Sequence, residues 1–319
     1  MNPDFPARPE PGPAAQHPVT EHPVTEHPAR LAVGVIGAGR AGTALGAALA
    51  RAGHAVVAAS AVSEASVRRA RAAFPGAVIT EPRQVLGRAD LALLTVPDDV
   101  LPGLVAGLAA TEAPLEGRML VHASGRHGLA VLEPAARRGG LPLALHPVMT
   151  FTGRSDDVDR LRGTCFGVTA PEVLRPAAEA LVIEMGGEPV FIAEKHRDLY
   201  HAALAGAANH LITLVAQAED LLRAAGVADP ARLLGPLLSA ALDNALRFGD
   251  AGLTGPVARG DAETVAAHVA ALDAEPSASP AAVAAYIAMA RLTADRALAS
   301  GLLKPADAER LLGVLGGRP

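Results

Sequence analysis

From Ala32 onward, short apolar runs alternate with longer segments in which apolar residues recur at helical spacing. The apolar runs have the length of buried strands, and Gly or Pro residues separate many of them from the helical segments. Strands that alternate with helices in this way are typical of a parallel sheet covered on both faces. The predicted strands are 33–36, 54–60, 77–80, 91–96, 119–122, 143–145, 164–169 and 189–192, with helices at 43–51, 66–74 and 171–185.

The pattern changes near residue 193, after which every periodic segment is helical. Four helices are predicted in this part, at 198–225, 231–248, 262–272 and 281–300. We therefore expect a Rossmann-type α/β domain with a doubly wound parallel sheet over 31–193, followed by an all-helical domain over 194–319. Residues 1–30 are rich in proline and repeat a His-Pro pair, so they are predicted to form a disordered tail.

Composition narrows the class of protein. A chain of 319 residues with 50% hydrophobic content is long enough for two domains with apolar cores. The net charge of -5, the absence of a basic block and the low aromatic content make a nucleic-acid partner unexpected. A single cysteine and no signal-peptide pattern fit a cytoplasmic protein. The most apolar helix carries Asn209 and His210 at its centre, so no membrane partner is expected.

The most specific motif is G-x-G-x-x-G, which follows the first strand directly and opens the first helix. Its three glycines allow, in order, a tight turn, an approach of the backbone to phosphates and close packing of helix on strand. The helix N-terminus adds unpaired N–H groups and a partial positive charge. The segment is predicted to bind a dinucleotide pyrophosphate, and its residues are Gly37, Ala38, Gly39, Arg40, Ala41 and Gly42.

The end of the second predicted strand indicates which dinucleotide is bound. An NAD site usually has Asp or Glu there, about 20 residues after the glycines, but this chain has Ser60 and no carboxylate. A hydroxyl, with Arg40 and the later Arg68 and Arg69, suits the 2′-phosphate of NADP. We predict NADP over NAD, a flavin dinucleotide or S-adenosylmethionine, and expect at least one of Arg68 and Arg69 to lie on a solvated helix face.

Further polar residues follow the predicted strands, at the edge where ligands of such sheets bind. Val96, Pro97 and Asp98 follow one strand and are expected beside the cofactor, although Asp98 could instead cap the next helix. Ser124 follows the next strand, and with His146 it is expected to line the nicotinamide end. No carboxylate or cysteine joins the histidines at ligand spacing, so no metal is expected.

Motifs in both halves together resemble a family of Rossmann-like proteins whose C-terminal domain is known only as domain of unknown function 2520. The family is similar to pyrroline-5-carboxylate reductases, ketopantoate reductases and 6-phosphogluconate dehydrogenases. The resemblance implies a Rossmann domain joined to a helical domain, a homodimer, and a small-molecule substrate in the cleft between domains. Relatives often have Arg after the second-strand serine, where this chain has Ala61. The motifs are 37–42, 96–99, 122–125, 146–151, 200–201, Asn209 and 253–261 with His268.

Three residues of the helical domain are candidates for the chemistry. In an unbroken α-helix His201 and Asn209 lie on one broad face, and similarity to ketopantoate reductases puts His201 where those enzymes have their lysine. Arg259 stands beside a helix start at Asp261, its predicted N-cap, so it either binds an anion or pairs with Asp261. Similarity to pyrroline-5-carboxylate reductases implies a substrate carboxylate there.

The sequence thus predicts a cytoplasmic NADPH-dependent reductase that acts on C=O or C=N of a small carboxylate-bearing metabolite. His201 is predicted as the proton donor, Asn209 as the group that orients the reacting atoms, and Arg259 as the carboxylate anchor. A ketopantoate-like 2-oxo acid is the first substrate expectation and a cyclic imino acid, as in pyrroline-5-carboxylate reductases, the second. A non-catalytic NADP-binding sensor is the alternative from another class.

Overall fold

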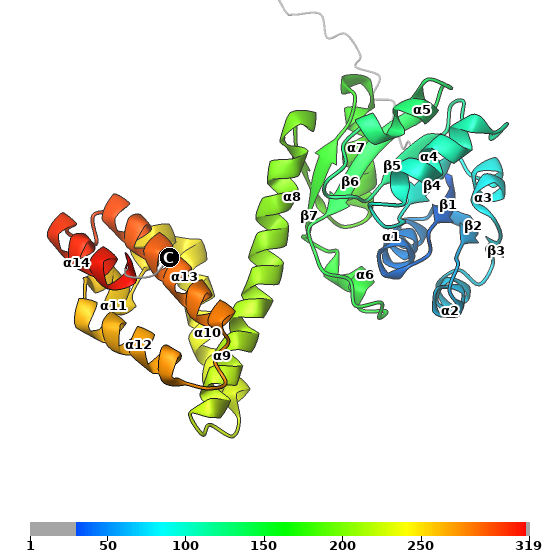
Figure 1. Ribbon diagram of the computed structural model, residues 1–319. Helices are drawn as coiled ribbons and strands as arrows, with labels where there is room; N and C mark the ends of the chain where they lie inside the picture. The colour runs from blue at the N-terminus through cyan, green and yellow to red at the C-terminus, as the bar shows by residue number, and fades with distance from the viewer. Residues whose placement is uncertain (1–29, 317–319) are drawn as a thin grey trace, which may run out of the picture. The chain divides into compact units, whose positions relative to one another are not determined.

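The computed structural model describes residues 30–316, and the chain forms two compact units (Figure 1). The first unit extends to Tyr200 and the second begins at His201. Apart from Arg30, the predicted N-terminal tail lies outside the described residues.

Within residues 30–316, an eight-stranded sheet forms the centre of the first unit, in the order β3-β2-β1-β4-β5-β6-β7-β8. The strands are β1 (Ala32–Ile36), β2 (Ala55–Ser60), β3 (Val78–Ile79), β4 (Leu91–Leu94), β5 (Met119–His122), β6 (Leu141–Pro147), β7 (Cys165–Thr169) and β8 (Glu188–Phe191). Strands β1 to β6 are parallel, and the order reverses between β1 and β4. The predicted Rossmann-type doubly wound sheet is confirmed.

The last part of the sheet departs from the all-parallel prediction. β7 runs antiparallel to β6, and β8 is parallel to β7. The chain between β6 and β7 contains only the one-turn helix α6 (Asp157–Arg160). An antiparallel neighbour needs no crossover helix, so this connection returns the chain to the adjacent position.

Helices cover both faces of the sheet, and each face has its own apolar core. On one face pack α1 (Arg40–Arg51), α2 (Glu64–Ala73), α6 and α7 (Arg175–Glu184), and on the other α3 (Pro82–Arg88), α4 (Leu101–Ala110) and α5 (Glu133–Ala136). The central strands are therefore buried on both sides, which explains their continuous apolar runs, whereas the edge strands β3 and β8 are partly exposed. Sequence analysis expected a helix after Asp98 but gave no range for α4, and it did not predict α3 or α5. The short 3₁₀ segments are η1 (Ala130–Leu132), η2 (Glu172–Leu174) and η3 (Glu194–His196).

The second unit is all-helical in its described part, as predicted. Its elements are α8 (Arg197–Ala205, which begins in the first unit), the π-helical turn η4 (Gly206–His210), α9 (Leu211–Ala224), α10 (Pro230–Phe248), η5 (Gly249–Gly252), α11 (Gly255–Arg259), α12 (Ala262–Ala274), α13 (Pro280–Ala299) and α14 (Pro305–Gly316). The apolar core of this unit lies among α11 to α14. Asp229, Asp261 and Ser279 cap α10, α12 and α13 by accepting a backbone N–H, so the predicted cap at Asp261 is confirmed.

One prediction for the second unit was wrong. An unbroken α-helix was expected over 198–225, but η4 interrupts it. A π turn has i→i+5 hydrogen bonds and is wider than an α turn, so the face that His201 and Asn209 would share in an ideal α-helix no longer follows. The turn starts at Gly206, whose low helix propensity makes an interruption less costly at this point.

Among the described residues, the stretch Glu194–Ala224 is long and apolar enough to cross a membrane by length and composition, with a mean hydropathy of 1.2. One such stretch is weak evidence, because helices of soluble proteins pass the same test. The expectation of no membrane partner remains a prediction.

Candidate functional site

The glycine loop lies where the strand order reverses, at the carboxyl end of β1. Gly37 has a φ of +92°, and a Cβ there would lie 2.9 Å from the backbone carbonyl of Thr95, so only glycine fits. A Cβ on Gly42 would collide with Thr95 Oγ1 and would lie 2.5 Å from Gly37 O. The remaining glycine, Gly39, faces open space, because a Cβ there would meet nothing closer than 3.9 Å. The loop therefore leaves no room for a side chain at Gly37 and Gly42, which lie against Thr95, and it is open at Gly39.

Hydrogen bonds to β2 and to the residue after β4 fix this loop. The backbone oxygen of Ser60 accepts from Gly37 N at 3.2 Å and from Ala38 N at 2.8 Å, and Ser60 Oγ accepts a second contact from Gly37 N at 3.2 Å. On the opposite side Thr95 Oγ1 donates to Gly37 O at 2.8 Å. Ser60 and Ala38 are buried. The hydroxyl predicted to meet a 2′-phosphate therefore supports the glycine loop in this structure.

The N-terminus of α1 has no side-chain cap. In the described part of the chain, no side chain accepts a hydrogen bond from its first turn, and that turn contains no acidic residue. The next helix differs, because Ser63 Oγ accepts from Ser66 N. The first-turn amides of Arg40, Ala41 and Gly42 thus carry the partial positive charge of the helix end without a protein anion to satisfy them. This is the arrangement that binds phosphate groups.

The residues after β2 complete the nucleotide edge of the site. Ala61 and Val62 follow Ser60, and Val62 is fully exposed. The first carboxylate is Glu64, which pairs with Arg68 at 3.4 Å on the solvated surface of α2. No carboxylate therefore occupies the end of β2, where it would repel a 2′-phosphate. The lack of a carboxylate at this position is compatible with a dinucleotide that carries this phosphate.

The residues after β4 and β5 are joined through a histidine that sequence analysis missed. His127 Nε2 bonds to Asp98 O at 3.0 Å, and the backbone N of His127 donates to Ser124 Oγ at 3.1 Å. Ser124 is buried, Asp98 is half-buried, and neither Asp98 nor Asp99 caps α4, whose N-cap makes no side-chain bond. No sequence signal indicated His127, because its two contacts reach across separate strand ends.

The other two residues predicted beside the cofactor lie directly after β4. Val96 is half-buried, and its side chain would contact a Cβ on Gly37 at 2.9 Å. Pro97 is exposed. The segment after β4 is therefore in contact with the glycine loop at Val96 and open to solvent at Pro97.

His122 ends β5 and is completely buried. Its Nε2 lies 2.8 Å from Gly128 O, and its Nδ1 lies 3.3 Å from the N–H of Ser124. These two contacts assign the neutral tautomer with the proton on Nε2. Burial lowers the pKa of His122 to about 4, against the opposing effect of the Gly128 hydrogen bond. His122 is therefore a neutral structural group at the root of the Ser124 loop.

Arg197, the first residue of α8, is a second buried polar group that sequence analysis missed. Its Nε donates to Thr169 Oγ1 at 2.8 Å, and its Nη2 donates to Ala144 O at 3.2 Å and to Gly167 O at 3.0 Å. Longer contacts of 3.5 Å reach the carbonyl oxygens of Ser124 and Gly125. Burial lowers the pKa of Arg197, and Tyr200 and Glu194 act in the opposite direction. One guanidinium thus holds together the chain after β5, the middle of β6 and β7.

His146 and Tyr200 form a polar pair beside this guanidinium. His146 Nδ1 lies 2.8 Å from the Tyr200 hydroxyl, and the rings meet edge to face. Burial raises the pKa of Tyr200, so the phenol is protonated at neutral pH, although the charge of Arg197 opposes this shift. Both side chains are half-buried. The pair places two exchangeable protons at the end of β6.

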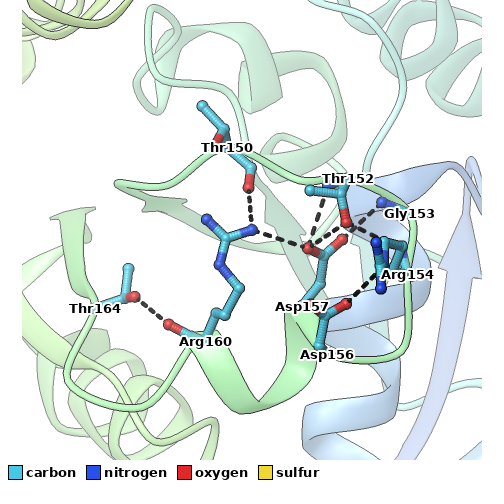
Figure 2. Close-up of polar contacts among 8 residues, drawn as sticks. All are labelled: Thr150, Thr152, Gly153, Arg154, Asp156, Asp157, Arg160 and Thr164. Carbon is cyan, nitrogen blue, oxygen red and sulfur yellow. Dashed lines mark hydrogen bonds and ion pairs between the residues drawn. The ribbon is translucent and has the colours of Figure 1, made fainter. Parts of the chain in front are cut away.

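The loop after β6 folds around a single carboxylate, as Figure 2 shows. Asp157 is buried and accepts from Gly153 N at 2.7 Å, from Thr152 Oγ1 at 2.9 Å and from Thr152 N at 3.2 Å. Arg160 adds an ion pair at 3.4 Å. Gly153 in turn lies against the side chain of Arg40, since a Cβ there would be 3.0 Å from Arg40 Cγ. Asp157 therefore positions a loop that contacts the start of α1.

The three candidates of the second unit come from separate elements. His201 is half-buried in α8, and Asn209 is exposed in the π turn, where its carbonyl accepts from Thr213 Oγ1 at 3.1 Å. Arg259 is exposed at the end of α11, two residues before the α12 cap. Its charge helps lower the pKa of Asp261, after the larger effect of the two Thr264 hydrogen bonds. Their predicted roles stay predictions.

No group of three or more metal-ligating side chains occurs among the described residues. The histidines at the strand ends bond instead to carbonyl oxygens, a backbone amide and a phenol.

Comparisons with known proteins agree with this architecture. A family model described as a Rossmann-like domain matches residues 16–147, and a model described as domain of unknown function DUF2520 matches residues 164–293. The two matches together cover most of the chain, and the DUF2520 model is that of the family which the sequence motifs resemble. No curated protein matches the chain.

Solved structures with the same fold include three that are informative. A candidate NADP oxidoreductase from Bacteroides fragilis is 21% identical, with a TM-score of 0.69 over 83% of this chain and 98% of that one. An imine reductase from Myxococcus stipitatus in complex with NADP+ is 19% identical, with a TM-score of 0.62 over 88% and 99%. A reductive aminase from Aspergillus terreus in complex with NADPH and ethyl levulinate is 17% identical, with a TM-score of 0.60 over 89% and 99%. At these identities the likeness establishes the fold.

The neutral state of His122 predicts an acid-sensitive fold. Between pH 6.5 and about 4 the unfolded chain binds a proton at this histidine that the folded chain does not, so stability falls as the pH falls through this window. The shift corresponds to about 3 kcal/mol at the acid end. His122→Gln keeps a donor for Gly128 O and should flatten this part of the profile, measured by urea unfolding at a series of pH values. Parallel profiles for the two proteins would contradict the assignment.

Asp157→Asn should loosen the loop after β6. Burial alone would raise the pKa of Asp157, but the hydrogen bonds from Gly153 and Thr152, with the charge of Arg160, hold it below the ordinary 3.8. The carboxylate therefore stabilises the fold above pH 3.8, and this contribution is lost as the pH falls through the lowered pKa. At pH 7 the variant should lose about 1–3 kcal/mol of unfolding free energy. The difference in unfolding free energy between the variant and wild type should shrink in acid. A difference that does not change with pH would refute this account.

Proposed function

We propose that this chain, in which a Rossmann-like domain precedes a DUF2520 domain, is a cytoplasmic NADPH-dependent reductase that acts on the C=N bond of a small, carboxylate-bearing imine. The observation that carries the proposal is the open glycine loop at the reversal of strand order. There the uncapped N-terminus of α1 meets a β2 end without a carboxylate. Dinucleotides bind at this place in doubly wound sheets.

The fit to NADP rests on the residues of the first unit. The free amides of Arg40, Ala41 and Gly42 would hold the pyrophosphate, and the absence of acid near Ser60 leaves room for a 2′-phosphate. Bound NADPH would supply the hydride. The names of the similar structures, an NADP oxidoreductase candidate and enzymes in complex with NADP+ or NADPH, support the same cofactor.

For the substrate, the imine now takes precedence over the ketopantoate-like 2-oxo acid. The similar structures include an imine reductase and a reductive aminase, whose names concern C=N chemistry. The chain also has His201 where the resemblance to ketopantoate reductases implies a lysine. Arg259 is exposed beside the N-terminus of α12, a suitable anchor for a substrate carboxylate.

Reduction of an imine needs a proton for its nitrogen as well as a hydride for its carbon. We keep His201 in this role, with Asn209 orienting the reacting group, since an imidazole is a common proton donor in enzymes. His146 and Tyr200 form a second source of protons at the carboxyl end of the sheet. In a conformation without the hydrogen bond to His146, the Tyr200 phenol would be the alternative proton donor.

NADPH consumption tests this function directly. Purified protein should oxidise NADPH in the presence of cyclic imines such as 1-pyrroline-5-carboxylate, and should prefer them to 2-oxo acids. His201→Ala should lower kcat roughly hundredfold while the Kd of NADPH stays unchanged, since general acid catalysis contributes at least this much. Tyr200→Phe serves as the matched comparison, because it removes the phenol hydroxyl, which is the other candidate proton donor. A protein that binds NADPH tightly but turns over none of the substrates would be a sensor, and the reductase proposal would fail.

We further propose that the protein is a homodimer formed through its helical unit. Helices α9 and α10 carry several large apolar side chains that are largely exposed, and on α10 Leu237 is 64% exposed and Leu246 79%. A monomer rarely exposes so much apolar surface. The exposed apolar residues of these two helices are Leu211, Ile212, Leu214, Leu233, Leu237, Leu242, Leu246 and Phe248.

The oligomeric state can be measured by light scattering after size exclusion. Wild type should elute as a dimer, and the double variant Leu237→Glu with Leu246→Glu should be a monomer, because charges on an apolar interface carry a large desolvation cost. Val173→Glu provides the control, since Val173 is 85% exposed but lies in the first unit. A monomeric wild type, or a dimer in the double variant, would overturn this interface.

A further inference from the structure

A cavity of about 290 Å³ lies along α1, and its lining includes Arg69, one of the two α2 arginines that sequence analysis considered for the 2′-phosphate. It is bounded by one face of α1, by the facing side of α2 and by the loop after β6. Three of its lining residues are arginines, namely Arg51 of α1, Arg69 of α2 and Arg154 of the loop, and no lining residue is acidic. The small side chains of Ala44, Ala47 and Ala72 leave the space open. The cavity is thus small, and its charged lining residues are all cationic.

The three arginines differ in their partners. Arg51 forms an ion pair with Asp159 at 2.6 Å, and Arg154 pairs with Asp156 at 3.5 Å, as Figure 2 shows for the second pair. Arg69 has no ion pair within residues 30–316, and its Nε is buried without a hydrogen-bond acceptor there. A buried donor without an acceptor is costly, more so on a charged group. Arg69 is therefore the one arginine of the cavity lining without an anionic partner among residues 30–316.

The cavity adjoins the glycine loop at one end. Thr43 lines it, and the hydroxyl of Thr43 donates to Gly39 O at 2.7 Å within the loop. Gly153 also lines the cavity and lies against the side chain of Arg40. The end of the cavity at Thr43 is thus about one helical turn from the uncapped amides of α1.

The neighbouring arginine on α2 has a different environment. Arg68 is exposed, pairs with Glu64 at 3.4 Å and does not line the cavity. Of the two adjacent arginines, only Arg69 faces the space between α1 and α2. The chain therefore supplies its own matched control, a side chain of the same charge one position away.

We propose that this cavity binds a phosphate group, with Arg69 as its principal ligand and Arg154 and Arg51 as secondary cations. A guanidinium donates two parallel N–H bonds to phosphate oxygens and stays charged when buried, so the chemistry of the lining fits a compact dianion. The phosphate is either the 2′-phosphate of a bound NADP or the phosphate of a free small molecule. If the ligand is the 2′-phosphate of NADP, the proposal rests on the proposed NADP site. It then assigns the protein residues that bind the phosphate by which NADP differs from NAD.

Binding measurements on Arg69→Gln and Arg68→Gln separate the two sources. We would titrate each protein and the wild type with NADP+, with NAD+ and with inorganic phosphate by calorimetry at constant ionic strength. If the cavity holds the 2′-phosphate, Arg69→Gln should bind NADP+ at least roughly tenfold more weakly and NAD+ as before, since a charge-assisted hydrogen bond contributes this much. If it holds a free phosphate, only inorganic phosphate binding should fall. Arg68→Gln should behave as wild type in both cases.

Arg154→Gln supplies a second test that does not depend on α2. It should weaken binding of the same ligand as Arg69→Gln, by a smaller factor because Asp156 already neutralises part of its charge. Thermal unfolding of the ligand-free variants checks that they fold. Unchanged affinities for all three ligands in folded Arg69→Gln would overturn the cavity proposal. A wild type that binds phosphate but no NADP+ would overturn the proposed function and leave the cavity with a free phosphate as its ligand.

Discussion

The close approach of the glycine loop to Thr95 is the constraint on which the rest of the first unit depends. Gly42 brings α1 so close to the chain after β4 that no side chain fits between them. Gly37 adopts a positive φ in the same space and is bonded on one side to Ser60 and on the other to Thr95. The helix therefore starts directly at the carboxyl end of β1. Its N-terminal amides are left without side-chain acceptors, an arrangement that suits phosphate groups.

A second constraint on the first unit lies among the chain after β5 and strands β6 and β7. Arg197 is a buried cation whose hydrogen-bond partners are carbonyl oxygens and a hydroxyl, with no carboxylate among them. A buried charge needs full hydrogen bonding to be tolerated, and five oxygens from three separate segments provide it. The same residue begins the helix that leads into the second unit, and Tyr200 follows one turn later. The path of this helix out of the sheet is thus tied to the strand ends.

The parts of the structure that sequence predicted are those that local rules determine. The strand, glycine loop and helix at 32–51 are contiguous, so their pattern could be interpreted directly, and Asp261 was predicted as a cap from its immediate neighbours. The antiparallel β7, His127 and Arg197 could not be predicted, because each depends on contacts between segments far apart in the chain. The roles expected of His201, Asn209 and Arg259 remain predictions.

Two adjacent residues of α2 also show that contacts between separate segments could not be predicted from the sequence. Arg68 and Arg69 are equivalent in sequence, and only the packing of α2 against α1 makes one solvated and the other part of a cavity wall. The uncapped amides at the start of α1 and Nε of Arg69 on α2 both lie beside α1, and neither has a side-chain acceptor among the described residues. The buried Nε of Arg69 lowers the stability of the ligand-free protein, and an anion that binds the folded state alone would offset that cost through mass action. Positive charge left uncompensated by the protein is therefore best understood as part of a binding site that extends beyond the glycine loop along α1.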